Sequence, residues 1–374
     1  MEFFKPGRTI DFLKHRRIFG SISFGLVVAS LISLFVPGPN FGIDFKGGTE
    51  LEVGFKGEVS TAELRSLVSD LGYQQSEVVS VQGSKVRYLI RIQEVSSLSA
   101  QQVKKIRASL ESALGETELQ EMKVSPGGDK ISLRLSASAD TDNLQEALEK
   151  AGAKVRKVTV FGGDFRYEAM LVGVGDEVVR GLVDKLGERG PDRQNMRIEW
   201  VGPKAGAQLR DAAIKSLLYA IAFIMAYVAL RFDLRFAPGG VVAMVHDALI
   251  TVGLFVLLRK EVNLATVAAL LTVVGYSIND TIVVYDRIRE NMQRMRDTGL
   301  YQLINVSTSQ TLSRTVVTSI TTLISIGGFF LWGTPMMRDI VFALFVGFLI
   351  GTYSSIYIAA PFTEWMDRRF FRRA

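Results

Sequence analysis

The residues of this 374-residue sequence that could do chemistry are few, and they lie inside long apolar stretches. Asp280 lies within residues 262–285, and His246 and Asp247 lie within residues 236–258. A charged group at membrane depth is costly, so it pairs with another group or lines a wet cavity, and it often marks an ion or proton pathway. These positions indicate ion coupling rather than covalent catalysis.

Asp280 is the strongest candidate for a proton-carrying carboxylate. On a helix, Ser277 and Tyr276 lie one turn before it, so its face is locally polar. The adjacent Asn279 could hydrogen-bond the carboxylate or a water molecule. The alternative interpretation is a structural carboxylate that is paired near the cytoplasmic interface.

Arg314 stands just before the next apolar stretch, residues 315–337, and keeps its charge at any physiological pH. A nearby cation and burial act on the charge of Asp280 in opposite directions. If the distance between the two side chains changes, Asp280 would bind a proton from one side of the membrane and release it to the other. Alternatively, Arg314 is an ordinary basic anchor at the start of its span.

Hydroxyl side chains continue from Arg314 at helical spacing, at Thr318, then Thr321 or Thr322, then Ser325. This row could line a water path to the carboxylate, or it could pack helices against one another.

Asp247 is a further candidate member of the polar path, and His246 stands beside it. The alternative is that these two residues cap a helix or anchor it near the inner leaflet.

The composition excludes several chemistries. There is no cysteine, so disulfides and thiolate chemistry are absent, and the only histidines are His15 and His246. The sequence contains neither a GxxxxGK[ST] phosphate loop nor an HExxH motif. We therefore expect no metal, no cofactor and no enzymatic activity, and no ATP bound by this chain.

Six apolar stretches are long enough to be membrane spans. A helix of about 20 apolar residues crosses the roughly 30 Å hydrocarbon core of a bilayer. Residues 18–36 and 340–363 contain no charge at all. The sequence therefore predicts a polytopic α-helical membrane protein with spans at 18–36, 212–230, 236–258, 262–285, 315–337 and 340–363.

Basic residues orient these spans. Lys and Arg are concentrated in residues 1–17, in the connections after the second and fourth spans, and in residues 364–374. Such residues mark cytoplasmic segments, so both termini are predicted to be cytoplasmic and residues 37–211 extracytoplasmic. The first span is interpreted as an uncleaved signal anchor. The net charge of +6 then reflects topology rather than nucleic-acid binding.

Residues 37–211 alternate strand and helix patterns, and the order β-α-β-β-α-β occurs twice. The segment that begins ELRSLVSDLG aligns with the later segment that begins NLQEALEKAG. We predict two tandem ferredoxin-like modules, at about 41–127 and 128–203, with or without strands shared between them. The alternative is a single irregular α+β domain.

Five segments carry a family resemblance. They are FGIDFKGGTELEV (41–53), WVGPKAGAQLR (200–210), GYSINDTIVVYDRIREN (275–291), QTLSRTVVTS (310–319) and GTYSSIYIAAP (351–361). In this order they strongly resemble the SecF family of the bacterial Sec protein-export machinery, a branch of the RND superfamily. The chain departs from the family in one respect, because the family usually has one small ferredoxin-like domain where this chain has room for two.

The resemblance implies half of a twelve-span transporter of the cytoplasmic (inner) membrane. It implies pairing with SecD and association with the SecYEG channel and YajC. The pair would use the proton motive force, or sodium in some relatives, to act on unfolded preprotein at the extracytoplasmic face after the ATPase SecA. The family positions tied to proton passage match Asp280 and Arg314.

Two other functional classes remain open at the level of sequence. One is a half-size RND-type transporter of small molecules or lipids, which would need a large apolar pocket in the loop domain. The other is a structural scaffold without ion flux, for which Asp280 would be dispensable.

Overall fold

The computed structural model describes residues 9–94, 98, 100–114, 117–125, 130–232, 235–333 and 335–371. The chain divides into two compact units. One comprises Met1–Phe41 with Asp211–Ala374, and the other comprises Gly42–Arg210.

Six helical segments in the described part of the chain are long and apolar enough to cross a membrane. They contain α1 (Arg16–Phe35), α7 (Pro203–Arg231), α8 (Ala237–Leu257), α9 (Leu264–Arg294), α10 (Leu300–Trp332) and α11 (Pro335–Ser354). The last segment continues after α11 through the π-helical turn η4 (Ser355–Ala359), α12 (Ala360–Met366) and η5 (Asp367–Phe371). The predicted class, a six-span helical membrane protein with an α+β domain, is confirmed.

Several helices extend beyond the apolar stretches that predicted them. The fifth span was predicted at 315–337, but α10 has 33 residues from Leu300 to Trp332 and ends at Gly333. Likewise α7 begins at Pro203, not at residue 212. Apolar composition marks only the hydrocarbon part of a span, whereas backbone hydrogen bonding continues into the interface. As a result Arg314 is the fifteenth residue of α10 and does not precede the helix.

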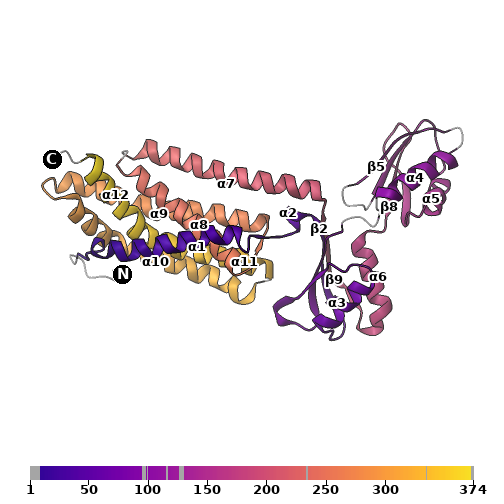
Figure 1. The fold of residues 1–374 in the computed structure, drawn as a ribbon, viewed down its shortest axis with the longest axis horizontal. Helices are drawn as coiled ribbons and strands as arrows, with labels where there is room; N and C mark the ends of the chain where they lie inside the picture. The colour runs from indigo at the N-terminus through magenta and orange to yellow at the C-terminus, as the bar shows by residue number, and fades with distance from the viewer. Residues whose placement is uncertain are drawn as a thin grey trace. The chain divides into compact units, whose positions relative to one another are not determined.

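The helices α8, α9 and α11 form the core of the membrane unit. Helix α1 packs on α8, and α10 packs on α9 and α11. Figure 1 shows α1 running alongside α8. In the most apolar part of α8, 61% of the residues are buried, whereas in the corresponding parts of α7 and α10 only 11% are buried. Helices α7 and α10 therefore leave most of their surface to lipid or to another chain.

Local sequence explains where these helices begin. Pro238 lies in the first turn of α8, where its missing N–H is not needed. Helix α9 starts with a capping box in which the Asn263 side chain accepts the Thr266 N–H at 2.9 Å and the Thr266 hydroxyl accepts the Asn263 N–H at 3.4 Å.

The segment before α1 docks onto α10. Asp11 accepts hydrogen bonds from the Tyr301 hydroxyl at 2.8 Å and the Asn305 amide at 2.9 Å. The Tyr301 bond, with the Lys14 N–H and Asn305, lowers the pKa of Asp11 below its ordinary 3.8. Asp11 is therefore a carboxylate at neutral pH, and its contribution to this docking is lost only as the pH falls through that lowered pKa.

A short parallel pair ties α1 to the connection between α8 and α9. Strand β1 (Asn40–Phe41) pairs with β10 (Glu261–Val262). Beside it the Arg259 guanidinium donates to the Gly38 carbonyl at 3.1 Å. These contacts join elements that are far apart in the sequence.

The second unit contains two four-stranded antiparallel sheets. The first has the order β3-β4-β2-β9 and is covered by helices α3 and α6. Its elements are β2 (Gly48–Phe55), α3 (Thr61–Asp70), β3 (Glu77–Ser80), β4 (Arg87–Ile92), α6 (Val174–Leu186) and β9 (Pro191–Val201).

The second sheet has the order β5-β6-β8-β7 and is covered by helices α4 and α5, which lie together (Figure 1). Its elements are α4 (Ala100–Ala113), β5 (Leu119–Val124), β6 (Lys130–Leu135), α5 (Thr141–Lys150), β7 (Val155–Val160) and β8 (Arg166–Leu171).

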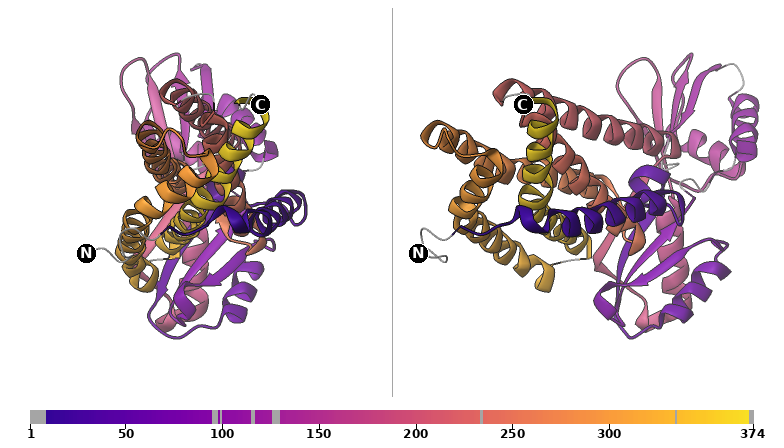
Figure 2. Two further views of the ribbon diagram at one scale, coloured as in Figure 1. Left: turned by 90° about the vertical axis from the view of Figure 1, so that its left-hand side faces the viewer. Right: turned by 60° about the vertical axis from the view of Figure 1, so that its left-hand side comes forward.

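The two modules exchange their last helix and strand, and this differs from the predicted tandem arrangement. In sequence, α4–β5 completes the first repeat and α6–β9 completes the second. In space, α6–β9 completes the sheet that begins with β2, and α4–β5 completes the sheet that begins with β6. Figure 2 shows the purple strands of the first sheet beside the pinker late elements. The boundaries 41–127 and 128–203 thus describe the sequence repeat and not the spatial modules.

The exchange has a simple physical reason. Each β-α-β-β half presents an open strand edge, at β2 or at β6, and an amphipathic helix with its strand can complete either one. The periodicity of the sequence is the same in both pairings. Only the packing of particular side chains selects one of them.

Glycines close the start of the first sheet. Gly47 and Gly48 have φ of +79° and +135°. A Cβ on Gly47 would lie 2.8 Å from Pro203 Cα, and a Cβ on Gly48 would lie 2.7 Å from the Ile92 carbonyl oxygen. Both positions need glycine because of their backbone angles and because neighbouring backbone approaches so closely.

Candidate functional site

Asp280 lies in α9 at the centre of the helical bundle. Its residue is only 3% exposed, and within the described residues its Oδ2 atom is buried and has no hydrogen-bond partner. Thr352 of α11 and Arg314 of α10 lie close enough to interact with the carboxylate. The Thr352 hydroxyl is also 2.7 Å from the Ser319 hydroxyl of α10. Three helices therefore meet at an incompletely satisfied carboxyl group.

Arg314 is exposed on α10. Among the residues that the structure describes, no salt bridge within 4.0 Å joins it to Asp280. The two side chains are near but not in contact.

The predicted polar neighbours of Asp280 do not form one cluster. Ser277 is buried and donates its hydroxyl to Asp247 instead. The Tyr276 hydroxyl lies 3.4 Å from that of Thr322 on α10. Asn279 is exposed on the surface of α9.

The row on α10 faces outward. Thr318 is exposed and Thr322 is half-buried, and their hydroxyls donate to the backbone carbonyls four residues earlier, Arg314 O at 2.9 Å and Thr318 O at 2.8 Å. Hydroxyls on a helix commonly satisfy themselves in this way. The row thus places polar atoms on a surface that this chain leaves uncovered.

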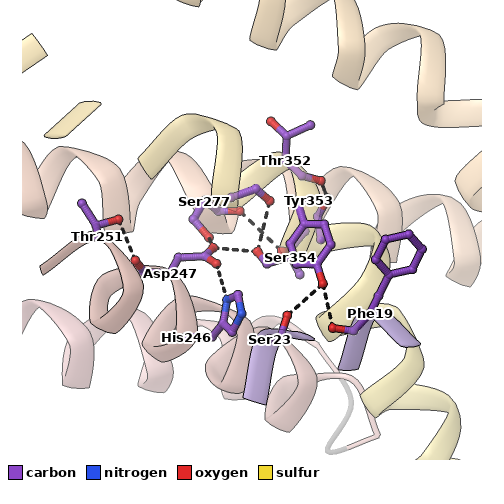
Figure 3. Close-up of polar contacts among 12 residues, drawn as sticks. Phe19, Ser23, His246, Asp247, Thr251, Ser277, Thr352, Tyr353 and Ser354 are labelled. Carbon is purple, nitrogen blue, oxygen red and sulfur yellow. Dashed lines mark hydrogen bonds and ion pairs between the residues drawn. The ribbon is translucent and has the colours of Figure 1, made fainter. Parts of the chain in front are cut away.

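Asp247 is the most completely buried carboxylate of the bundle. It is 0% exposed and lies near the middle of α8, so it neither caps that helix nor anchors it at an interface. Its Oδ1 atom lies 2.8 Å from His246 Nδ1. Its Oδ2 atom accepts the hydroxyls of Ser354, at 2.6 Å, and of Ser277 (Figure 3).

The network continues from this pair to α1. The His246 ring lies 6.3 Å from the Tyr353 ring, centre to centre. The Tyr353 hydroxyl lies 2.8 Å from the Ser23 hydroxyl and donates to the Phe19 carbonyl at 2.9 Å (Figure 3). Helices α1, α8, α9 and α11 are therefore linked by polar contacts inside an otherwise apolar bundle.

Sequence reasoning missed the contributions of α11. Thr352, Tyr353 and Ser354 were noted only as part of a family segment, although Ser354 contacts a carboxylate 107 positions away. A signal existed, because consecutive hydroxyl residues inside an apolar span need partners. The sequence did not show which carboxylate they serve.

The chemistry available here is the binding and release of a proton or another small ion. The described residues contain no group of three or more His, Cys, Asp or Glu that could hold a metal ion. The fold defines a polytopic helical membrane protein that carries two buried carboxyl groups in its helical bundle, with an added α+β ferredoxin-like unit.

Comparisons with known proteins make this class specific. Residues 182–369 match the family model "Protein export membrane protein SecD/SecF, C-terminal", and residues 32–59, which include Gly47 and Gly48, match the "SecD/SecF GG Motif". The protein translocase subunit SecF of Koribacter versatilis is 33% identical, with 99% of this chain and 95% of that protein covered. The SecF of Magnetococcus marinus is 35% identical, covering 98% and 95%. The chain belongs to the SecF family of protein translocase subunits, which confirms the resemblance.

Solved structures agree with this assignment. The crystal structure of SecDF, a translocon-associated membrane protein from Thermus thermophilus, superimposes with a TM-score of 0.58 at 27% identity. It covers 98% of this chain, and this chain spans 40% of that longer protein. A second SecDF structure, in a super-membrane-facing form, gives a TM-score of 0.52. These relatives do not favour a half-transporter of small molecules or lipids.

Proposed function

We propose that this chain pairs with SecD and uses the proton motive force to assist preprotein translocation through SecYEG, after the ATP-dependent action of SecA. In this proposal it resides in the cytoplasmic (inner) membrane with both termini cytoplasmic. Its ferredoxin-like unit meets unfolded preprotein outside, and YajC belongs to the same assembly. Membership of the SecF family and the six spans support this reading.

One observation carries the coupling mechanism, namely the buried Asp280 carboxyl group with an unpartnered Oδ2 atom. A buried charge without a partner is costly, so the arrangement seen here suits a protonated carboxyl group. Arg314 is always charged and lies near it. A movement of α10 against α9 that brings the guanidinium into contact would favour release of the proton.

The energy involved is sufficient for mechanical work. One charge that crosses a potential of 100 mV gains about 2.3 kcal/mol. Several protons per cycle would then drive a change in helix packing.

The uncovered polar surface supports pairing with SecD. Asn279, Arg314 and Thr318 are all exposed on α9 and α10. Polar groups that face hydrocarbon are costly, so a second protein or water must cover them in the membrane. A SecD half of similar design would do so, and the three residues would then lie at the centre of the pair, not at its surface.

Charge pairs near the span ends support the proposed orientation. Arg16 pairs with Glu364 at 2.6 Å, and Arg235 pairs with Asp367 at 3.2 Å. Both pairs involve segments whose excess of basic residues indicates the cytoplasmic side.

The central test replaces Asp280 by Asn in the complex with SecD, reconstituted in membrane vesicles with SecYEG and SecA. We expect proton uptake to disappear and proton-driven preprotein release to fall at least about tenfold, the equivalent of 1.4 kcal/mol. ATP-driven insertion by SecA should persist.

Asp286→Asn provides the matched control, because Asp286 is on the same helix but exposed, 3.9 Å from both Arg231 and Arg289. If Asp280→Asn has normal ion uptake and normal secretion, the coupling mechanism is wrong and the chain is a structural scaffold without ion flux. Comparing vesicles that carry a proton gradient with vesicles that carry only a sodium gradient identifies the coupling ion.

A further inference from the structure

The second buried carboxylate, Asp247, has no part in the coupling mechanism proposed above. It is fully enclosed, and its neighbour His246 is 5% exposed (Figure 3). Ionisable groups at such depth are rare and tend to be functional.

The donors around Asp247 are arranged for an ionised carboxylate. His246 Nδ1 points to one oxygen, and the hydroxyls of Ser354 and Ser277 donate to the other. Three donors favour the charged form of the carboxyl group. Donors that point at the Asp247 carboxylate occupy the oxygen lone pairs that a metal cation would need. The site is therefore better suited to binding a proton than to binding a metal cation.

No fixed cation balances that charge among the described residues. Helix α8 has no other charged residue, and α1 has none after Arg17. On α9 the nearest ionisable groups are Tyr276 and Asp280, neither of which is a cation, and on α11 and η4 the neighbouring ionisable groups are Tyr353 and Tyr357. On α12 and η5, Glu364 and Asp367 already pair with arginines. The available counter-charge is therefore a second proton on His246.

His246 has one atom free to take that proton. Its Nε2 atom is buried and has no partner among the described residues, while Nδ1 is committed to Asp247. A neutral imidazole that donates through Nδ1 carries its lone pair on Nε2.

We propose that His246 and Asp247 form a second proton-binding site, in which the proton adds to His246 Nε2. Binding forms one N–H bond and converts a pair of net charge −1 into a neutral imidazolium–carboxylate pair. Release breaks the same bond and restores the lone pair.

This site also touches the helix of the first one. Ser277 bonds Asp247 and lies three residues before Asp280, on the same side of α9. Packing is tight here, since a Cβ on Gly351 of α11 would lie 3.2 Å from Ser277 Cα. We infer that a proton on His246 changes the strength of the Ser277–Asp247 hydrogen bond that holds α9, and with it the position of Asp280. This inference rests on the proposed function.

The two histidines of the chain allow a direct test. In His15→Gln, His246 is the only imidazole of this chain, so nitrogen NMR of the full-length complex with SecD in lipid reports on it alone when only this chain carries the nitrogen label. We expect the nitrogen signals to show Nε2 gaining and losing a proton as the pH is varied. Asp247→Asn should abolish this titration, leaving His246 neutral throughout, and Asp280→Asn should preserve it. If Asp247→Asn does not fold, Ser354→Ala replaces it in the test. This variant removes one of the hydrogen bonds to Asp247 and should shift the His246 titration to a different pH.

An imidazole that stays in one state throughout the pH titration would overturn the proposal, and so would a response to sodium instead of pH. The influence on Asp280 is tested separately by His246→Gln, which should shift the pH profile of proton-driven secretion without abolishing it. An unshifted profile overturns the link to α9. Because the NMR titration does not depend on transport, failure of the proton-driven function would not be confused with failure of this site.

Discussion

The two buried aspartates of the bundle differ in how far their oxygen atoms are satisfied. Asp247 has three hydrogen-bond partners, whereas Oδ2 of Asp280 has none among the described residues. A fully bonded carboxylate holds its surroundings in place, and an incompletely bonded one can change partners at little cost. This difference favours Asp280 as the group that meets a moving arginine.

Backbone conformation at a single residue yields a prediction for the GG turn. Gly47→Ala places a Cβ on a residue with positive φ, against the backbone atoms of Pro203. These backbone atoms cannot move aside as the end of a flexible side chain would. The combination of positive φ and extended ψ at this residue, φ +79° and ψ 166°, alone costs a non-glycine residue about 1–3 kcal/mol, and the clash adds to it. We expect faster proteolysis of the ferredoxin-like unit in membranes.

Gly163→Ala is the matched control, because nothing lies within 4 Å of a Cβ at that position. Equal protease resistance of the two variants would show that the close approach at Gly47 is unimportant.

At the scale of elements, helix boundaries decide what Arg314 can do. An arginine before a span would anchor it at the interface, but the fifteenth residue of a 33-residue helix lies within the bundle's length. The apolar stretch begins only at residue 315, so it does not predict the earlier turns of α10, which are polar yet still helical.

The exchanged modules make a second prediction at this scale. The core of the first sheet contains no residue from 98–171, but α6 contributes five of its buried side chains, namely Val174, Val178, Val179, Leu182 and Leu186. Deleting 98–171 across a short Gly-Ser linker should therefore leave this module folded. Deleting 128–203, the second sequence repeat, removes α6 and β9.

Burial of each of those side chains contributes about 1.5 kcal/mol or more, so losing five costs roughly 8 kcal/mol, comparable to the whole stability of a domain. We expect the first deletion to accumulate in membranes with a protease-resistant module and the second to be degraded. The opposite pattern, in a pulse-chase experiment, would contradict the exchanged topology.

For the molecule as a whole, the uncovered polar side of α10 predicts an assembly surface. Thr318→Trp places a large ring there and should reduce co-purification of SecD at least about tenfold, the equivalent of 1.4 kcal/mol. Ile324→Trp is the control, because Ile324 is an apolar residue of the same helix, 71% exposed and turned to another side. If both variants lose SecD equally, or neither does, the polar surface is not the specific contact.

The sequence by itself determined the number of spans, the position of the added domain, its internal repeat and the family, and it predicted Asp280 and Arg314 as the pair that carries the proton. Apolar length, 3.6-residue periodicity and charge near span ends are local properties, so they can be read without a structure. The same local patterns also singled out Asp247, but not what surrounds it.

Only the tertiary structure decided which side chains meet. It showed that Ser277 serves Asp247 and not Asp280, that Ser354 joins them from 107 positions away, and that the modules exchange α4–β5 for α6–β9. Hydroxyl residues and amphipathic units each have several chemically equivalent partners along this chain. The choice among them depends on close packing between distant segments, and local pattern carries no record of that.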